Sequence, residues 1–98
     1  MKRLHVVCVC GYGTGTSLIL KMSVEDVLSN AGIDADVEFM DVTSALGLRC
    51  DLILSNTELF EQLERGNADV KVIPVTDFLD KEIIAKEVVP TARELAEA

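Results

Sequence analysis

The chain has 98 residues and 49% apolar composition, which is the size and character of one domain, here residues 1–98, with its own core. Its net charge of −8 disfavours nucleic acids and anionic membrane surfaces as partners, because phosphate contacts need clustered Lys and Arg. Its apolar runs are too short for membrane insertion, and its odd number of cysteines, three, argues against a secreted disulfide framework and favours a cytoplasmic location.

The first third of the chain predicts a strand followed by a helix. Residues 4–10 are apolar apart from His5 and rich in valine, which indicates a buried strand. Residues 16–31 repeat apolar side chains at helical spacing, and Gly32 follows as a natural end of the helix. The glycine-rich turn between these elements is therefore a strand-to-helix junction.

The middle of the chain continues the alternation. Residues 35–42 alternate apolar and acidic side chains, which is typical of an edge strand with one face in water. Residues 51–55, DLILS, predict a short buried strand. Residues 57–65 predict a short helix that Thr57 caps and Gly66 ends.

The last third predicts a fourth strand and a final helix. Residues 70–75 have strand character, and Pro74 favours an edge position because it lacks an amide donor. The final helix begins near residue 80 and runs towards residue 94. Pro90 either kinks this helix or begins a second segment of it.

Alternation of strands and helices predicts the fold class α/β, with a four-stranded parallel sheet covered by helices on both faces. Right-handed crossovers and the two edge-strand signals give the strand order 2-1-3-4. In such sheets a ligand binds at the carboxyl ends of the strands where the order reverses, here between the first and third strands. The loop of residues 10–17 and the segment 55–58 both belong at that place.

The stretch VCVCGYGTGTS, residues 7–17, is the candidate site. Glycines let the backbone amides curl inward at a helix N-terminus, where they bind an oxyanion, and the hydroxyl residues add donors. The same positive potential is expected to lower the pKa of the Cys10 thiol and make it a nucleophile towards phosphorus. The predicted catalytic residue is Cys10, and the predicted phosphate-binding residues are Gly11, Tyr12, Gly13, Thr14, Gly15, Thr16 and Ser17.

Other readings of this loop fit less well. Its glycines fall at 11, 13 and 15, which is not the spacing of a dinucleotide fingerprint, and Lys21 comes too late for a nucleotide P-loop. Cys8 and Cys10 supply only two metal ligands, so no metal site is expected and Cys8 is assigned to the core. A glycine-rich junction that merely turns the chain does not require a cysteine and three hydroxyls.

Cys10 and Ser17 have the spacing found in low-molecular-weight tyrosine phosphatases, which use C-x5-R-S at this junction. Here Thr16 stands in place of the arginine that stabilises phosphoryl charge during transfer to water. A cysteine that can be phosphorylated but is poorly equipped for hydrolysis suits a phosphoryl carrier.

The segment VVCVCGYGTGTSLILKMSVEDVL resembles the IIB proteins of the bacterial sugar phosphotransferase system (PTS), in particular the ascorbate/galactitol type and, more broadly, lactose/ascorbate IIB proteins. The resemblance implies a flavodoxin-like or low-molecular-weight-phosphatase-like three-layer sandwich. It also implies that Cys10 is a phosphocysteine, which accepts phosphate from a phosphohistidine of the IIA protein and passes it to a sugar at the IIC membrane transporter. No cofactor is implied. Tyr12 departs from the family pattern and is a candidate partner-facing residue.

Two alternative functions stay open: a phosphatase or arsenate-reductase-like enzyme, and a non-enzymatic regulatory domain that binds an anion.

Several further residues are assigned by position. His5 is roughly 16 Å along a strand from Cys10, too far to act as its base, and is assigned a structural role. Cys50 is assigned to inert core, and Asp41 to solvent. The segment Ser55, Asn56 and Thr57 could donate to phosphate or meet a partner. Asp77 and Asp80 are the acids that could approach the site, and Glu58, Glu61 and Glu64 are assigned to a solvated helix face.

Overall fold

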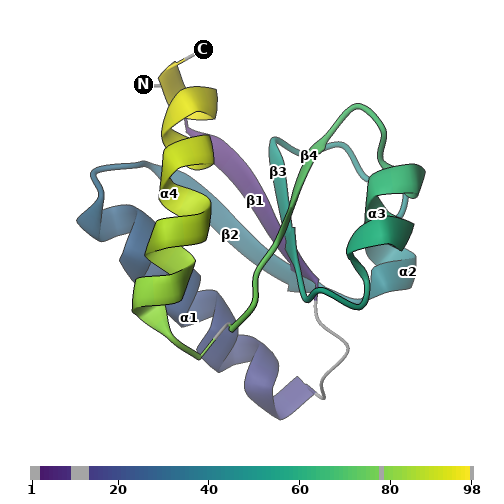
Figure 1. Ribbon diagram of the computed structural model, residues 1–98, viewed down its shortest axis with the longest axis horizontal. Coiled ribbons are helices and arrows are strands. Elements are labelled where there is room, and N and C mark those ends of the chain that lie inside the picture. Colours follow the sequence, from purple (N-terminus) through teal and green to yellow (C-terminus); the bar gives the residue numbers. More distant parts are fainter. Residues whose placement is uncertain (1–2, 10–13, 78, 98) are drawn as a thin grey trace.

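A parallel sheet lies between two layers of helices (Figure 1). The computed structural model describes residues 3–9, 14–77 and 79–97, with residues 14–18 described by their backbone. Its elements in chain order are β1 Leu4–Val9, α1 Thr14–Asn30, β2 Ala35–Met40, α2 Val42–Ala45, β3 Leu52–Ser55, α3 Phe60–Gly66, β4 Lys71–Pro74 and α4 Lys81–Glu97. The strand order is β2-β1-β3-β4 and each neighbouring pair is parallel, which confirms the predicted topology.

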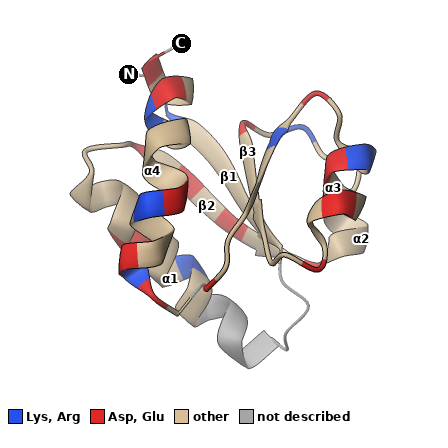
Figure 2. Cartoon of the chain, viewed as in Figure 1, with Lys and Arg blue, Asp and Glu red and all other residues tan. Residues whose placement is uncertain are grey.

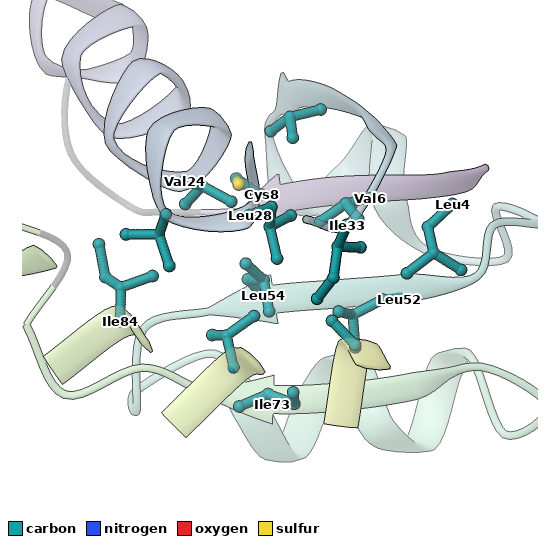
Figure 3. Close-up of a cluster of buried hydrophobic side chains, with 14 of the residues drawn as sticks. Leu4, Val6, Cys8, Val24, Leu28, Ile33, Leu52, Leu54, Ile73 and Ile84 are labelled. Atoms are coloured by element: carbon teal, nitrogen blue, oxygen red, sulfur yellow. The ribbon is translucent and has the colours of Figure 1, made fainter. Parts of the chain in front are cut away.

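One face of the sheet packs against α1 and α4 and forms the larger core. Alternate residues of β1 and β3 point to this face, among them Cys8 and Leu54, which are Cα partners in the sheet register (Figure 3). Both are fully buried, which confirms the assignment of Cys8 to the core. From the helices this core receives Leu20, Val24, Val27, Leu28, Ile84, Val88, Ala92 and Ala96.

The other face packs against α2 and α3. It receives the remaining alternate residues of β1 and β3, namely Val7, Val9 and Ile53, together with Ala45 of α2 and Leu63 of α3. Because β1 and β3 bury side chains on both faces, they read as nearly continuous apolar runs, as central strands of a parallel sheet do. Helices therefore cover both faces, as predicted.

The edge strands differ from the central ones in the expected way. In β2 the side chain of Val37 is buried while Asp36 and Glu38 are exposed. The ring Nε2 of His5, on the neighbouring strand, lies 2.8 Å from a carboxylate oxygen of Glu38. At the opposite edge β4 ends at Pro74, which has no amide hydrogen to offer a further strand.

Two boundaries near the carboxyl edge of the sheet differ from the sequence prediction. Helix α1 begins at Thr14, so Gly15 lies in its first turn and not in the preceding loop. Strand β2 ends at Met40 and not at residue 42, because Asp41 caps the short helix α2 by accepting a 2.9 Å hydrogen bond from the Ser44 N–H. The β-branched residues at the start of α2 favour a strand locally, and the cap overrides that preference.

Two predictions about helix ends and interruptions also need correction. Thr57 does not cap α3: the helix begins at Phe60, and the side chain of Asn56 accepts from the Leu59 N–H at 3.3 Å. Pro90 does not begin a second segment, because α4 runs through it on the exposed side of the helix. The carboxylate of Asp80 accepts from the Glu82 N–H at the start of α4.

Candidate functional site

The strand order reverses between β1 and β3, as predicted. The Cα partner of Val9, the last residue of β1, is Ser55, the last residue of β3. From these two ends the chain leaves in opposite directions: β1 leads to α1 on one face, and β3 leads to α3 on the other. Divergence of two neighbouring crossovers opens the sheet edge to a ligand at this point.

The N-terminus of α1 supplies the electrostatics of an anion site. The first N–H groups of a helix have no acceptor within the helix, and here they include those of Thr14, Gly15 and Thr16. The first turn contains no acidic residue that could compete with an anion. A helix of 17 residues adds the positive end of its macrodipole. These backbone groups can hold a phosphoryl group without a lysine or arginine.

The predicted site residues divide into two groups. Four of them, Cys10, Gly11, Tyr12 and Gly13, lie outside the described residues, so their roles stay predictions. The other four form the first turn of α1. In sequence Cys10 directly follows Val9, and the loop that it begins therefore starts at the reversal point.

Ser55, at this edge of the sheet, is buried in a way that is unusual for a polar residue. Its side chain is fully buried, and its hydroxyl has no hydrogen-bond partner among the described residues. A buried hydroxyl without a partner costs roughly 1–3 kcal/mol of stability. Buried polar groups that remain unpaired are uncommon, and one beside a candidate site is a functional candidate.

We expect Ser55→Ala to leave the fold intact and to raise the free energy of unfolding by about 1 kcal/mol, because it removes an unpaired buried hydroxyl. Urea denaturation of the purified domain measures this change. A loss of stability of similar size would show instead that the hydroxyl is hydrogen-bonded in solution, for example to a buried water.

The carboxylates near this edge are engaged in local structure. Asp77 accepts from the Leu79 N–H at 2.9 Å, in the turn before α4. Hydrogen bonds from the Ser44 hydroxyl and N–H lower the pKa of Asp41, which supports its role as a cap. With Asp80 also at a helix start, these three acids serve turns and caps.

The cysteines outside the candidate loop are poorly suited to nucleophilic chemistry. Cys8 is fully buried in the larger core. Cys50 lies before β3, towards the amino edge, and is half-buried rather than part of the closed core. Burial raises the pKa of its thiol, whose sulfur lies 3.8 Å from the Leu52 carbonyl oxygen. The prediction that Cys50 is inert therefore gains a physical reason.

Sequence reasoning missed an apolar surface beside the site. Ile19 and Met22 are each 54% exposed on α1, and Leu79, before α4, is 70% exposed. The signal was present in the helix pattern, because Ile19 and Met22 fall outside the repeat of buried residues at 20, 24, 27 and 28. The predicted exposure of Glu58, Glu61 and Glu64 is confirmed, but Glu58 lies in the turn before α3 and not on the helix.

The strand order, with crossovers to both faces of the sheet, defines a doubly wound α/β protein. The chain belongs to the family described as PTS system, lactose/cellobiose specific IIB subunit, whose model matches residues 5–89. Membership makes it a phosphoryl-transfer component of a sugar phosphotransferase system.

Two further comparisons agree with this assignment. The chain is 32% identical, over 82 residues, to the ascorbate-specific PTS system EIIB component of Mycoplasma pneumoniae (strain ATCC 29342 / M129 / Subtype 1), with 82% of this chain and 85% of that protein covered. The structure matches the lactose-specific IIB component domain of the phosphoenolpyruvate:carbohydrate phosphotransferase system from Streptococcus pneumoniae. That match has a TM-score of 0.60 at 14% identity and covers 98% and 97% of the two chains, so it shows a shared fold.

The family resemblance and the fold class expected from the sequence are thus confirmed. Of the helices within residues 14–77 and 79–97, none combines the length and the apolar character needed to cross a membrane.

Proposed function

We propose that this protein is a cytoplasmic phosphoryl carrier in which Cys10 accepts a phosphoryl group from a phosphohistidine of a IIA protein and passes it to a sugar at a IIC transporter. The observation that carries the proposal is the acid-free N-terminus of α1, which follows the loop that Cys10 begins at the end of β1. Family membership supports the same reaction class.

In the first transfer the Cys10 thiolate attacks phosphorus in line with the bond to the histidine nitrogen. A sulfur–phosphorus bond forms, the phosphorus–nitrogen bond breaks, and its electron pair returns to the imidazole of the donor. In the second transfer a sugar oxygen attacks phosphorus, and the sulfur leaves as thiolate. The proton of the sugar hydroxyl passes to a base of the acceptor complex, so this chain needs no general acid of its own.

We assign the backbone N–H groups of residues 11–17 to binding the oxygens of the phosphoryl group. The negative charge of these oxygens is most exposed while the phosphoryl group moves from one partner to the other. N–H donors that are already in place stabilise this charge without rearrangement. The side chains of Thr14, Thr16 and Ser17 are proposed to add hydroxyl donors. This arrangement serves both transfers because it binds the group and not a particular donor or acceptor.

A hydrolytic function is the second candidate, and it fits the chain less well. Residues 10–17 contain no arginine to stabilise the charge during transfer to water, and the nearby acids serve caps and turns.

The specificity of the Mycoplasma relative makes ascorbate the first acceptor to test.

The test is intact-mass measurement after incubation with phosphoenolpyruvate and the upstream transfer proteins, including IIA. We expect about 80 Da to be added, the mass of one phosphoryl group. Hydrolysis of p-nitrophenyl phosphate by the isolated protein, without a stable adduct, would favour the phosphatase. Anion binding with no covalent adduct would favour a regulatory domain. Either result contradicts the carrier function.

A further inference from the structure

Large apolar side chains are exposed mainly at one place on the described surface. Four of them are more than a third exposed: Ile19, Met22, Leu46 and Leu79. Leu46 follows α2, on the face of the sheet that α2 and α3 cover. The other three come from α1 and from the turn before α4. We call Ile19, Met22 and Leu79 the apolar patch.

An ion pair shows that the members of the apolar patch lie on one side of the molecule. Residues 19, 22 and 26 follow helical spacing, so Ile19, Met22 and Asp26 share a side of α1. Asp26 pairs with Lys81, the first residue of α4, at 2.9 Å. Leu79 comes two residues before Lys81, so it lies next to the same side of α1.

The apolar patch also lies near the candidate site. Because Asp26, in the carboxyl-terminal half of α1, pairs with the first residue of α4, the amino-terminal part of α1 extends beyond α4 (Figure 1). Ile19 is five residues into this part, roughly 7.5 Å along the axis from Thr14. A protein that delivers a phosphoryl group to the N-terminus of α1 must therefore cover or border this surface.

The amino-terminal part of α1, which carries Ile19 and Met22, differs in charge from the rest of the protein, whereas Leu79 stands between Asp77 and Asp80 in the chain. The chain contains 17 acidic residues, but the first of them is Glu25. Figure 2 shows acids on β2, α3 and α4. The first ten residues of α1, from Thr14 to Ser23, carry only the positive charge of Lys21. Over this region an approaching phosphoryl dianion meets the least repulsion from a protein of net charge −8.

From these observations we infer that the apolar patch is the docking surface for the phosphoryl donor, a phosphohistidine protein that presents apolar side chains around its phosphorylated residue. The inference rests on the proposed carrier function and assigns it a surface. A second copy of this chain fits the surface less well, because two chains of charge −8 repel each other. On docking, the donor buries apolar side chains, and its phosphoryl group approaches over the amino-terminal part of α1, where its charge meets little repulsion.

The test is the steady-state rate of phosphoryl transfer from purified, phosphorylated IIA to single variants Ile19→Gln, Met22→Gln and Leu79→Gln. We expect the KM for IIA to rise about tenfold in at least two of them with kcat nearly unchanged, as loss of a central apolar contact is worth about that factor. Met22→Ala, which shortens the side chain without adding polarity, should raise the KM less.

Leu46→Gln is the matched control, since it makes the same change at an exposed leucine on the other face. It should leave the KM for IIA unchanged. The alkylation rate of Cys10 should be the same in all variants, which shows that the reactive loop is intact.

Several outcomes would overturn the docking surface. An unchanged KM in the patch variants, or an equal rise in Leu46→Gln, contradicts it. So does a defect confined to transfer from the phosphorylated protein to the transporter, which would assign the surface to the acceptor. A wild-type dimer in sedimentation that the patch variants dissociate would assign it to a second copy. If the wild type accepts no phosphoryl group, the proposed function fails first; if it does and the KM is constant, the docking surface alone fails.

Discussion

Replacement of Cys10 by serine is expected to abolish phosphoryl acceptance from IIA. The oxygen of serine is almost fully protonated at neutral pH, whereas a thiol at a helix N-terminus has a lowered pKa and supplies thiolate. The variant keeps the size and polarity of the side chain, so the loop should retain its ability to bind an anion. Intact-mass measurement after incubation with phosphorylated IIA should show no added phosphoryl group.

Cys50→Ser is the matched control, because of the two described cysteines Cys50 is the one that is not fully buried. It should accept phosphate at the rate of the wild type. Burial raises the pKa of the Cys50 thiol above its ordinary value of 9.0, so less than about 1% of it is thiolate at pH 7. Each unit by which the pKa of Cys10 lies below that of Cys50 increases the thiolate fraction of Cys10 close to tenfold.

Iodoacetamide should therefore modify Cys10 at least tenfold faster than Cys50 at pH 7, and this difference should shrink as the pH rises towards the pKa of Cys50. Peptide mass mapping during a time course measures both rates. Phosphorylation of Cys10→Ser at the wild-type rate, or preferential labelling of Cys50, would remove Cys10 from the role of nucleophile.

Leu54→Ala is expected to lower the free energy of unfolding by about 3 kcal/mol, through lost burial and the cavity left behind. Leu54 is fully buried in a central strand, where its Cα partners are Cys8 on one side and Ile73 on the other (Figure 3). A domain of this size has a total stability of roughly 5–15 kcal/mol, so the loss is a large fraction of it. Urea denaturation monitored by circular dichroism gives the value.

Leu79→Ala serves as the control, because it removes the same atoms from a side chain that is 70% exposed. Its free energy of unfolding should stay within about 0.5 kcal/mol of the wild type. Equal losses in the two variants would mean that Leu79 is covered in solution, which would also contradict a free docking surface. The stability of Leu79→Ala therefore checks a premise of the KM experiment.

The acidic cap on α2 gives a further expectation about pH. The pKa of Asp41 is lowered in the folded protein, so its contribution to stability is present at neutral pH and is lost as the pH falls through that lowered pKa. Asp41→Asn should make the acid limb of a stability-versus-pH curve shallower. An unchanged curve would show that the cap contributes little.

Much of the fold follows from local patterns in the sequence. The apolar runs at 4–10 and 51–55 predict central strands, and the alternation of acids from residue 35 predicts an edge. The rule for right-handed crossovers then leaves the order 2-1-3-4, which the structure has. The starts of helices were predicted less well. Asp41 and Asn56 each accept one backbone N–H near the start of a helix, and such single hydrogen bonds compete with the local secondary-structure propensity.

By itself the sequence determined the family, the sheet order and the one cysteine placed at the start of a glycine-rich junction, because spacing and periodicity are properties of neighbouring residues. Only the tertiary structure decided which surface adjoins that junction. Met22 and Leu79 are far apart in the chain, and they share a side of the molecule because α1 and α4 pack together and Asp26 pairs with Lys81. Tertiary packing likewise buried Ser55 without a partner among the described residues, which no local pattern encodes.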